Sequence, residues 1–210
     1  MTTVDRGNFF MLLRQPRLAK YLWCITIGLP IWFCSGILIA FADRLALGSG
    51  VMGAITIANS AVFYNFGVSS GDFLSGWLSQ VFKSRKRVIF GFQLGLLGII
   101  FAYLLWPGLP QWAFYLFTWL IGLGAGYWAV FVTNAAEQFG TNIRSTVSNT
   151  VPNFVRGALV PMGWAFAFLY PKLGMTYAAL VIGVAVSLLA MFATFQIEET
   201  FGKDLDYVEE

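Results

Sequence analysis

Long runs of hydrophobic residues alternate with short polar stretches along the whole chain, and each run is long enough to cross a lipid bilayer. The pattern predicts six helices, at about 18–41, 51–81, 88–106, 112–136, 144–169 and 175–195. A helix of about 20 apolar residues covers the hydrocarbon core, because it rises ~1.5 Å per residue. We therefore expect an all-α integral membrane protein, with a six-helix transmembrane bundle in residues 18–197.

The composition excludes a soluble protein. Charged residues make up 11% of the chain and hydrophobic residues 58%, whereas a soluble domain carries roughly 25% charged residues. The net charge of +3 does not indicate a nucleic-acid partner, because the cations lie at the predicted membrane boundaries rather than along one face. The lipid bilayer is thus the first expected partner.

A basic loop between the second and third predicted helices sets the orientation. It contains four cations: Lys83, Arg85, Lys86 and Arg87. Short basic loops are retained on the cytoplasmic side. The cytoplasmic or interfacial segment 1–17, which includes Arg6, the loop 137–144 and the acidic tail 198–210 then share that side. Both termini are expected to be cytoplasmic.

The chain has few groups suited to cofactor or catalytic chemistry. Histidine is absent, and Cys24 and Cys34 lie ten residues apart in one apolar helix. This spacing indicates neither a metal site nor a disulfide framework, and two buried thiols fit better. No nucleophile and base stand in a recognisable pattern. We expect no cofactor, no metal and no enzyme activity.

Three predicted cytoplasmic stretches resemble motifs of the major facilitator superfamily. Residues 76–80 (GWLSQ) and 84–87 (SRKR) resemble the loop signature G-x-L-a-D … G-R-R/K between the second and third helices of a six-helix half. Residues 137–144 (EQFGTNIR) resemble the E-x6-R element between the fourth and fifth helices. Residues 199–206 (ETFGKDLD) resemble the E-T-x-G-x-x-L-E ending of sugar-porter-like members.

The chain also departs from that family's pattern. Gln80 stands where the loop signature has Asp, one extra residue precedes Ser84, and Gly140 replaces a loop proline. The family has twelve helices, whereas this chain has six predicted ones. The resemblance therefore covers half a transporter, and the ending at Glu199 and Leu205 points to the C-terminal half. It implies a homodimer, a partnership with a separate N-terminal half, or a truncated product.

The resemblance implies a facilitator-type secondary transporter, in which the two halves rock about a site at the membrane midplane. The first and fourth helices of each half line the cavity of such proteins. Aromatic and amide side chains suit a small polar solute such as a sugar. The expected substrate-binding residues are Tyr64, Asn65, Tyr127, Trp128, Asn134, Asn153 and Arg156. The alternative is that amides bridge helices, aromatics face lipid and small residues in 67–76 and 122–126 serve helix packing.

The resemblance also implies a latch of cytoplasmic charges that closes the inner side in one state. The expected gating residues are Asp72, Gly76, Arg85, Lys86, Arg87, Glu137 and Arg144. Glu137 and Arg144 are expected to pair with each other or with the basic loop. The alternative is that the basic residues set the topology by touching lipid headgroups.

Arg156 is the most distinctive single residue, because it falls near the middle of the fifth predicted helix. Burying a cation there costs at least about 2.5 kcal/mol, so Arg156 needs a partner or water. Asp72 is the one acid placed deep enough, and a homodimer would allow an Asp72–Arg156 contact between copies. The roles that fit are a substrate or anion site, a gating pair, or a static pair or snorkelling side chain.

The sequence thus predicts a half-size facilitator-type transporter in a cytoplasmic membrane of bacterial type, with its coupling ion left open. The competing prediction is a non-transporting membrane subunit, an orphan half that only packs against a partner.

Overall fold

The computed structural model describes residues 7, 9–203, 206 and 208, and over these residues the fold is all-helical. The expectations for Arg6 and Leu205 lie outside the described residues. The elements are η1 (Phe9–Leu13), α1 (Arg17–Phe33), η2 (Cys34–Ile39), α2 (Ala42–Gly48), α3 (Ile57–Val81), α4 (Arg85–Leu105), α5 (Gln111–Ala125), α6 (Trp128–Glu137), α7 (Arg144–Gly157) and α8 (Leu159–Gln196).

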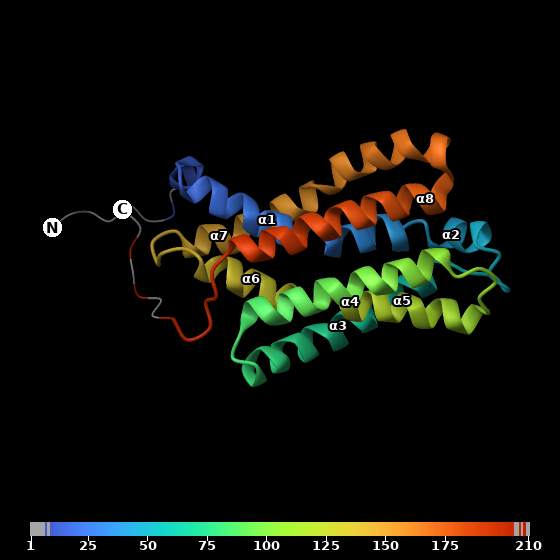
Figure 1. Ribbon diagram of the computed structural model, residues 1–210, viewed down its shortest axis with the longest axis horizontal. Coiled ribbons are helices and arrows are strands. Elements are labelled where there is room, and N and C mark those ends of the chain that lie inside the picture. The colour runs from blue at the N-terminus through green and yellow to red at the C-terminus, as the bar shows by residue number, and fades with distance from the viewer. Residues whose placement is uncertain (1–6, 8, 204–205, 207, 209–210) are drawn as a thin grey trace.

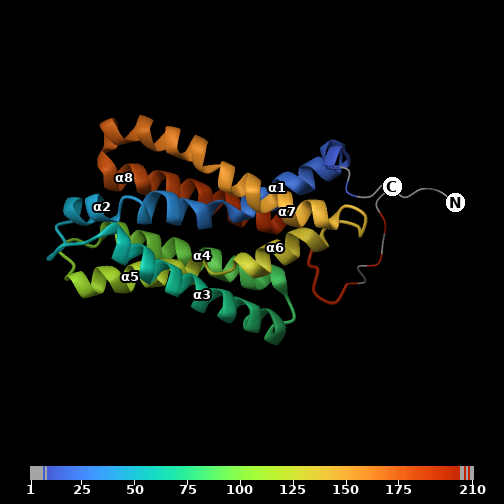
Figure 2. The same cartoon turned by 180° about the vertical axis from the view of Figure 1, so that it is seen from behind.

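The long helices run back and forth along the longest axis of the molecule (Figures 1 and 2). One end of the bundle carries the α3–α4 connection, the α6–α7 connection and residues 197–203, and we call it the tail end. Helix α8 reverses at Gly174, which has φ 75° and ψ 169°, so residues 159–173 and 175–196 form two antiparallel limbs. A positive φ of this kind suits glycine, which has no Cβ.

Four helical stretches have the length and apolar composition to cross a membrane: Arg17–Ile39, Arg85–Leu105, Gln111–Glu137 and Arg144–Gln196. The fifth and sixth predicted helices both lie within the last stretch, which Gly174 divides. The second predicted helix is not among the four, because α3 carries Asn65, Asp72 and a row of serines. These stretches agree with an integral membrane protein.

Helix α3 begins at Ile57, later than the predicted start at Val51. The preceding residues instead lie beside the α4–α5 connection. The N–H of Met52 donates to the carbonyl of Leu109 at 2.9 Å, and the N–H of Gln111 donates to the carbonyl of Met52 at 3.0 Å. This pairing holds residues 51–56 in a non-helical connection, which periodicity alone does not reveal.

Helices α3 and α5 are in backbone contact along two pairs of glycines. A Cβ on Gly67 or on Gly122 would lie 2.1 Å from a backbone oxygen of the other helix. One turn further on, a Cβ on Gly126 would lie 2.5 Å from the Cα of Gly71. Small residues four apart are the usual means by which membrane helices approach closely. The packing role predicted for the glycine-rich run 122–126 is therefore confirmed.

The fourth predicted helix, 112–136, is broken into α5 and α6 at Gly126 and Tyr127. The Asp72 carboxylate accepts a hydrogen bond from the N–H of Ala129 at 3.1 Å, so it lies at the N-terminus of α6. A negative charge is favourable there, because the unpaired N–H groups and the helix dipole both point at it. The break thus leaves backbone donors that a side chain of α3 satisfies.

We expect Gly122→Ala to reduce the free energy of unfolding by about 1–3 kcal/mol, because its methyl group would push against the backbone of α3. The matched control is Gly76→Ala, where a Cβ meets nothing within 4 Å. Thermal unfolding followed by circular dichroism in detergent checks both variants. Equal stability of the two would mean that the α3–α5 contact is not close.

Candidate functional site

One side of the bundle exposes a row of polar side chains on α3, α6 and α7, which we call the polar face. Its residues are Asn65, Ser69, Thr133, Asn149, Asn153 and Arg156. Helix α6 packs against both α3 and α7 and lies between them (Figure 2). For a bundle that crosses a membrane, such a face is costly against lipid. It therefore calls for water or another protein surface.

The sequence of α7 explains why its polar residues share a face. Asn149, Asn153 and Arg156 follow one another at helical spacing and are exposed. Val151 and Val155, on the opposite side, are buried in the core. Helix α7 is thus an amphipathic segment within an otherwise apolar stretch, and its polar side faces away from the bundle.

Arg156 lies near the middle of the limb formed by α7 and the first part of α8, and it contacts aromatic rings. Its guanidinium carbon lies 4.9 Å from the centroid of the Trp32 ring, and Trp32 meets Trp128 edge-on at 6.3 Å between ring centroids. A cation over the face of a tryptophan is attracted by the electron density of the ring. Among the described residues, no carboxylate is ion-paired with Arg156.

Within one chain, the Asp72 carboxylate bonds to the N-terminus of α6 rather than to Arg156. A contact between two chains stays a prediction. Asn65 and Asn153 are both exposed on the polar face, and each amide nitrogen donates to a carbonyl one turn earlier in its own helix, at 2.7 and 2.8 Å. Trp128 is half-buried beside this face.

Three predicted binding residues lie in the packed interior instead of on the polar face. The hydroxyl groups of Tyr64 and Tyr127 donate to the carbonyls of Ile31 and Ile27, at 3.2 and 2.9 Å. The amide of Asn134 donates to the hydroxyl of Thr200 at 3.0 Å. Buried polar groups need such partners, so these three side chains hold helices and the tail segment together.

The tail end of the bundle holds a charged cluster centred on Glu199, which joins the segment after α8 to the start of α4. The carboxylate of Glu199 accepts hydrogen bonds from the N–H groups of Arg85 and Lys86, at 3.0 and 3.2 Å, and from the hydroxyl of Ser84. It also accepts from the N–H of Phe201 at 3.0 Å. A carboxylate therefore occupies the N-terminus of α4.

Arg85 and Lys86 extend this cluster to α6 and α8. The Nη2 of Arg85 lies 2.6 Å from the Oε1 of Glu137 on α6. The Nζ of Lys86 donates to the carbonyls of Phe195 and Ile197, at 2.9 and 2.8 Å, and so satisfies the C-terminus of α8. Of the two partners expected for Glu137, the structure shows the basic loop. We call Arg85, Lys86, Glu137 and Glu199 the latch.

The Arg85–Glu137 ion pair is not fully satisfied. Both side chains are largely buried, with 19% and 10% of their surface exposed. The Nε of Arg85 and the Oε2 of Glu137 are buried atoms without a hydrogen-bond partner among the described residues. A buried pair with unused donors and acceptors gives less than a bidentate pair would. This pair is therefore a single contact and not a bidentate one.

The other predicted gating residues lie outside this set of contacts. Arg144 donates through its Nε to the carbonyl of Phe139 at 3.4 Å, within its own connection. Gly76 has open space beside it, since a Cβ there would meet nothing within 4 Å. Arg87 has an exposed side chain, and its N–H donates to the hydroxyl of Ser84 at 3.1 Å.

Sequence reasoning missed Ser84, Gln138 and the central role of Glu199. Gln138 exchanges hydrogen bonds with the backbone of Glu198, at 2.7 and 3.4 Å, and so holds the same segment from the other side. Ser84 caps α4, which its position just before a helix start could have indicated. The contact of Glu199 with Arg85 joins residues 114 positions apart, which local patterns do not reveal.

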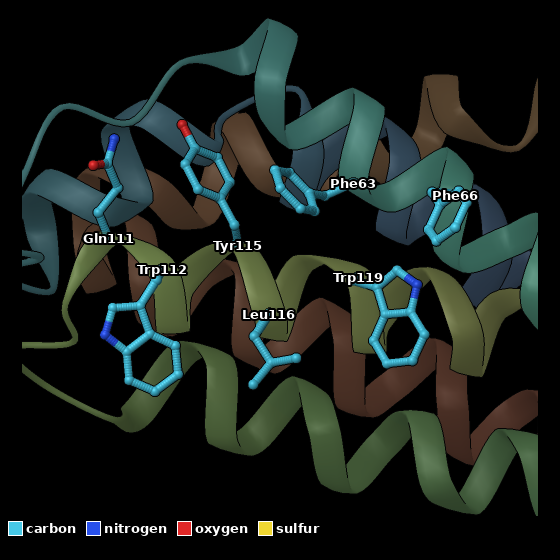
Figure 3. Close-up of a pocket in the computed structure, with 7 residues that line it drawn as sticks. All are labelled: Phe63, Phe66, Gln111, Trp112, Tyr115, Leu116 and Trp119. Carbon is cyan, nitrogen blue, oxygen red and sulfur yellow. The ribbon is translucent and has the colours of Figure 1, made fainter.

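A hollow of about 730 Å³ lies between α3 and α5, away from the latch (Figure 3). It is lined by Phe63, Phe66, Gln111, Trp112, Tyr115, Leu116 and Trp119. Two of its polar groups are engaged: the hydroxyl of Tyr115 accepts from the N–H of Thr56, and the amide of Gln111 donates to the carbonyl of Ala54. The Nε1 of Trp119 is buried without a hydrogen-bond partner among the described residues. An aromatic, open groove of this kind suits hydrocarbon better than a polar solute.

No protein-family model matches the chain, and a comparison with curated proteins also finds no match.

We expect Glu199→Gln to loosen the segment 197–203, because hydrogen bonds to a charged acceptor contribute about 1.5–3 kcal/mol each. Amide hydrogen exchange of this segment should become faster by one to two orders of magnitude. Glu198→Gln is the matched control, because Glu198 is exposed and pairs with Lys203 alone among the described charged residues. Similar exchange in the two variants would contradict a central role for Glu199.

The docking of this segment should also depend on pH. Partial burial of Glu199 opposes ionisation, but hydrogen bonds from Ser84 and the N–H groups of Phe201, Arg85 and Lys86 outweigh it, so its pKa lies below the ordinary 4.5. The ionised form therefore favours the docked state. Its contribution is fully present above pH 4.5 and is lost as the pH falls through the lowered pKa.

Hydrogen exchange of residues 197–203, measured across acidic pH and corrected for the intrinsic rate, tests this dependence. The wild-type chain should lose protection below the ordinary pKa of glutamate, whereas Glu199→Gln should show a much smaller change. An equal acid response in both proteins would assign the effect to another group.

Proposed function

We propose that the chain is one six-helix half of a facilitator-type secondary transporter, which moves a small polar solute, such as a sugar, by alternating access. In this proposal six segments cross the membrane, both termini are cytoplasmic, and the membrane is a cytoplasmic one of bacterial type. The observation that carries the proposal is the polar face, with Arg156 at mid-limb in an otherwise apolar stretch. Intramembrane cations of this kind mark substrate or ion pathways.

The spatial meeting of the three motif-like stretches supports the resemblance to the major facilitator superfamily. Arg85, Glu137 and Glu199 each belong to a different stretch, and Arg85 contacts both acids. These contacts span 52 and 114 positions of the chain. Alternating helices alone would bring the three stretches to one end of the bundle, but they do not require direct contacts between these charged residues.

The latch provides a means of switching between states. It joins α4, α6 and the segment after α8 through charges, and the Arg85–Glu137 pair leaves one donor and one acceptor unused. A movement of α6 would have to break this ion pair together with the hydrogen bonds of Asn134 and Gln138 to the segment after α8, and water would have to solvate the two separated charges. In the proposed cycle, the closed latch holds the tail end together and its opening admits solute from that side.

The break between α5 and α6 supports a binding role for the nearby polar face. Transporter sites are commonly built where a membrane helix is discontinuous, because freed backbone groups and helix ends can contact a polar solute. Here the N-terminus of α6 is already capped by Asp72. Arg156 lies over Trp32, and Trp128 meets that ring edge-on, so the site combines donors with aromatic rings, which a hydroxylated solute would use.

A half-transporter needs a second half to close its cavity. The polar face would lie against a second copy of the chain or against a separate N-terminal half, with the solute between them. A second copy would also bring another Asp72 and Arg156, so an ion pair between chains belongs to this proposal.

A second candidate function is a non-transporting subunit whose polar face only binds a partner. The side-chain contacts favour it in one respect: Arg156 is already held over Trp32, and the amide nitrogens of Asn65 and Asn153 are already bonded within their own helices. Because these side chains already have partners within the chain, they do not require a solute to satisfy them.

Cysteine labelling separates the two candidates without knowledge of the substrate. Asn153→Cys would place a thiol on the polar face, and Ala185→Cys, the matched control, would place one on the exposed apolar side of α8. The native Cys24 and Cys34 are each 0% exposed and give little background. A transporter should admit a charged thiol reagent to position 153 from both sides of the membrane, but not to position 185.

The experiment uses the full chain in proteoliposomes, with reagent added outside or trapped inside. Labelling of position 153 from both sides supports alternating access. Labelling from neither side, or from the same single side under every condition, supports the non-transporting subunit and contradicts the transporter.

A further inference from the structure

A small basic pocket lies at the tail end of the bundle, between the first turns of α4 and the last turn of α8. Its volume is about 410 Å³. Three cations, one carboxylate and two aromatic rings line most of it: Lys83, Lys86, Arg87, Glu199, Phe90 and Phe195. Neither the polar face nor the aromatic groove between α3 and α5 shares these residues.

The charges in this pocket are not equally available. The Nζ of Lys86 is committed to two carbonyls at the end of α8. The carboxylate of Glu199 is committed to N–H groups of α4 and to Ser84. Lys83 and Arg87 have exposed side chains and enter no salt bridge among the described residues. The pocket therefore offers two uncommitted cations to an anion.

Aromatic rings give the pocket an apolar side. The rings of Phe90 and Phe195 lie 4.9 Å apart between centroids, one from α4 and one from α8. Further along the same two helices, Leu94 and Phe192 are exposed hydrophobic side chains. Cations at the helix ends thus stand next to an apolar surface that continues along both helices.

We propose that this pocket binds the phosphate group of an anionic phospholipid, with Lys83 and Arg87 as its cationic ligands. Helix α4 has the length and composition to cross a membrane, so its N-terminus lies where headgroups lie. Basic pockets between membrane helices bind anionic headgroups through charge, while the acyl chains follow the apolar helix surfaces. A free phosphate ion would use the cations alone, whereas a lipid uses both zones.

The proposal does not depend on transport, since it requires only that α4 crosses the membrane. It bears on the latch all the same, because Lys86 and Glu199 belong to both. A lipid phosphate bound beside them would lie next to the contacts that join α4 to the segment after α8.

Native mass spectrometry of the full chain in detergent tests the proposal. Phosphatidylglycerol and phosphatidylcholine with the same acyl chains are added in turn, and the dissociation constants are compared. The wild-type chain should bind phosphatidylglycerol more tightly. The double variant Lys83→Gln/Arg87→Gln should lose about 25-fold in this affinity, since each cation near a headgroup contributes about a factor of five.

Arg14→Gln is the matched control, because Arg14 is an exposed cation outside the pocket. It shortly precedes α1, whose N-terminus lies at the tail end (Figure 1). This variant should retain the wild-type affinity. An equal loss in the control would assign the binding to general charge attraction and overturn the pocket. Unchanged binding in the double variant would overturn it as well. Circular dichroism before and after heating confirms that each variant is folded.

Inorganic phosphate and glycerol phosphate distinguish the source of the anion. Added in millimolar excess, neither should displace phosphatidylglycerol, because neither has acyl chains for the apolar zone. Complete displacement by inorganic phosphate would show a free-anion site and overturn the assignment to lipid.

Discussion

The backbone contact between α3 and α5 at Gly67, Gly71, Gly122 and Gly126 is the constraint on which the rest of the bundle depends. Within a membrane, apolar side chains gain little by leaving lipid for protein, so helices associate through close packing and hydrogen bonds. Helix α3 shows this clearly, because its buried residues are glycines and serines together with Tyr64, and none is a large aliphatic residue. Its place in the fold is therefore set by shape.

That contact also positions the polar elements. Because Gly71 touches Gly126, the neighbouring Asp72 reaches the N-terminus of α6 and satisfies donors that the break in the helix leaves open. Helix α6 then runs toward the tail end, where Glu137 meets Arg85. The glycine contact, the helix break and the latch thus follow one another along α5 and α6. A displacement of α6 would be felt at both of its ends, by Asp72 and by Arg85.

The sequence predicted the coarse features well, since they depend on composition and local spacing. Long apolar runs, tight turns and a glycine-rich stretch are readable without a structure. The sequence does not show which side of a helix faces the core when both sides are apolar. Three residues expected in a binding site instead form hydrogen bonds within the interior: Tyr64, Tyr127 and Asn134. The start of α3 at Ile57 follows from hydrogen bonds between residues 51–56 and the α4–α5 connection. The hydrogen bonds of Glu199 involve residues more than a hundred positions away. Local sequence patterns reveal neither contact.

The charge of Arg156 sets a condition on whatever covers the polar face. Within the chain, Trp32 compensates part of the cost of this cation through its ring, but no carboxylate pairs with it among the described residues. If a covering surface removed the Arg156 guanidinium from water without supplying an anion or several hydrogen-bond acceptors, its burial would cost several kcal/mol. A covering surface made only of apolar side chains is therefore excluded. The partner, the solute, water or, for a snorkelling side chain, a lipid headgroup must present oxygen atoms to Arg156.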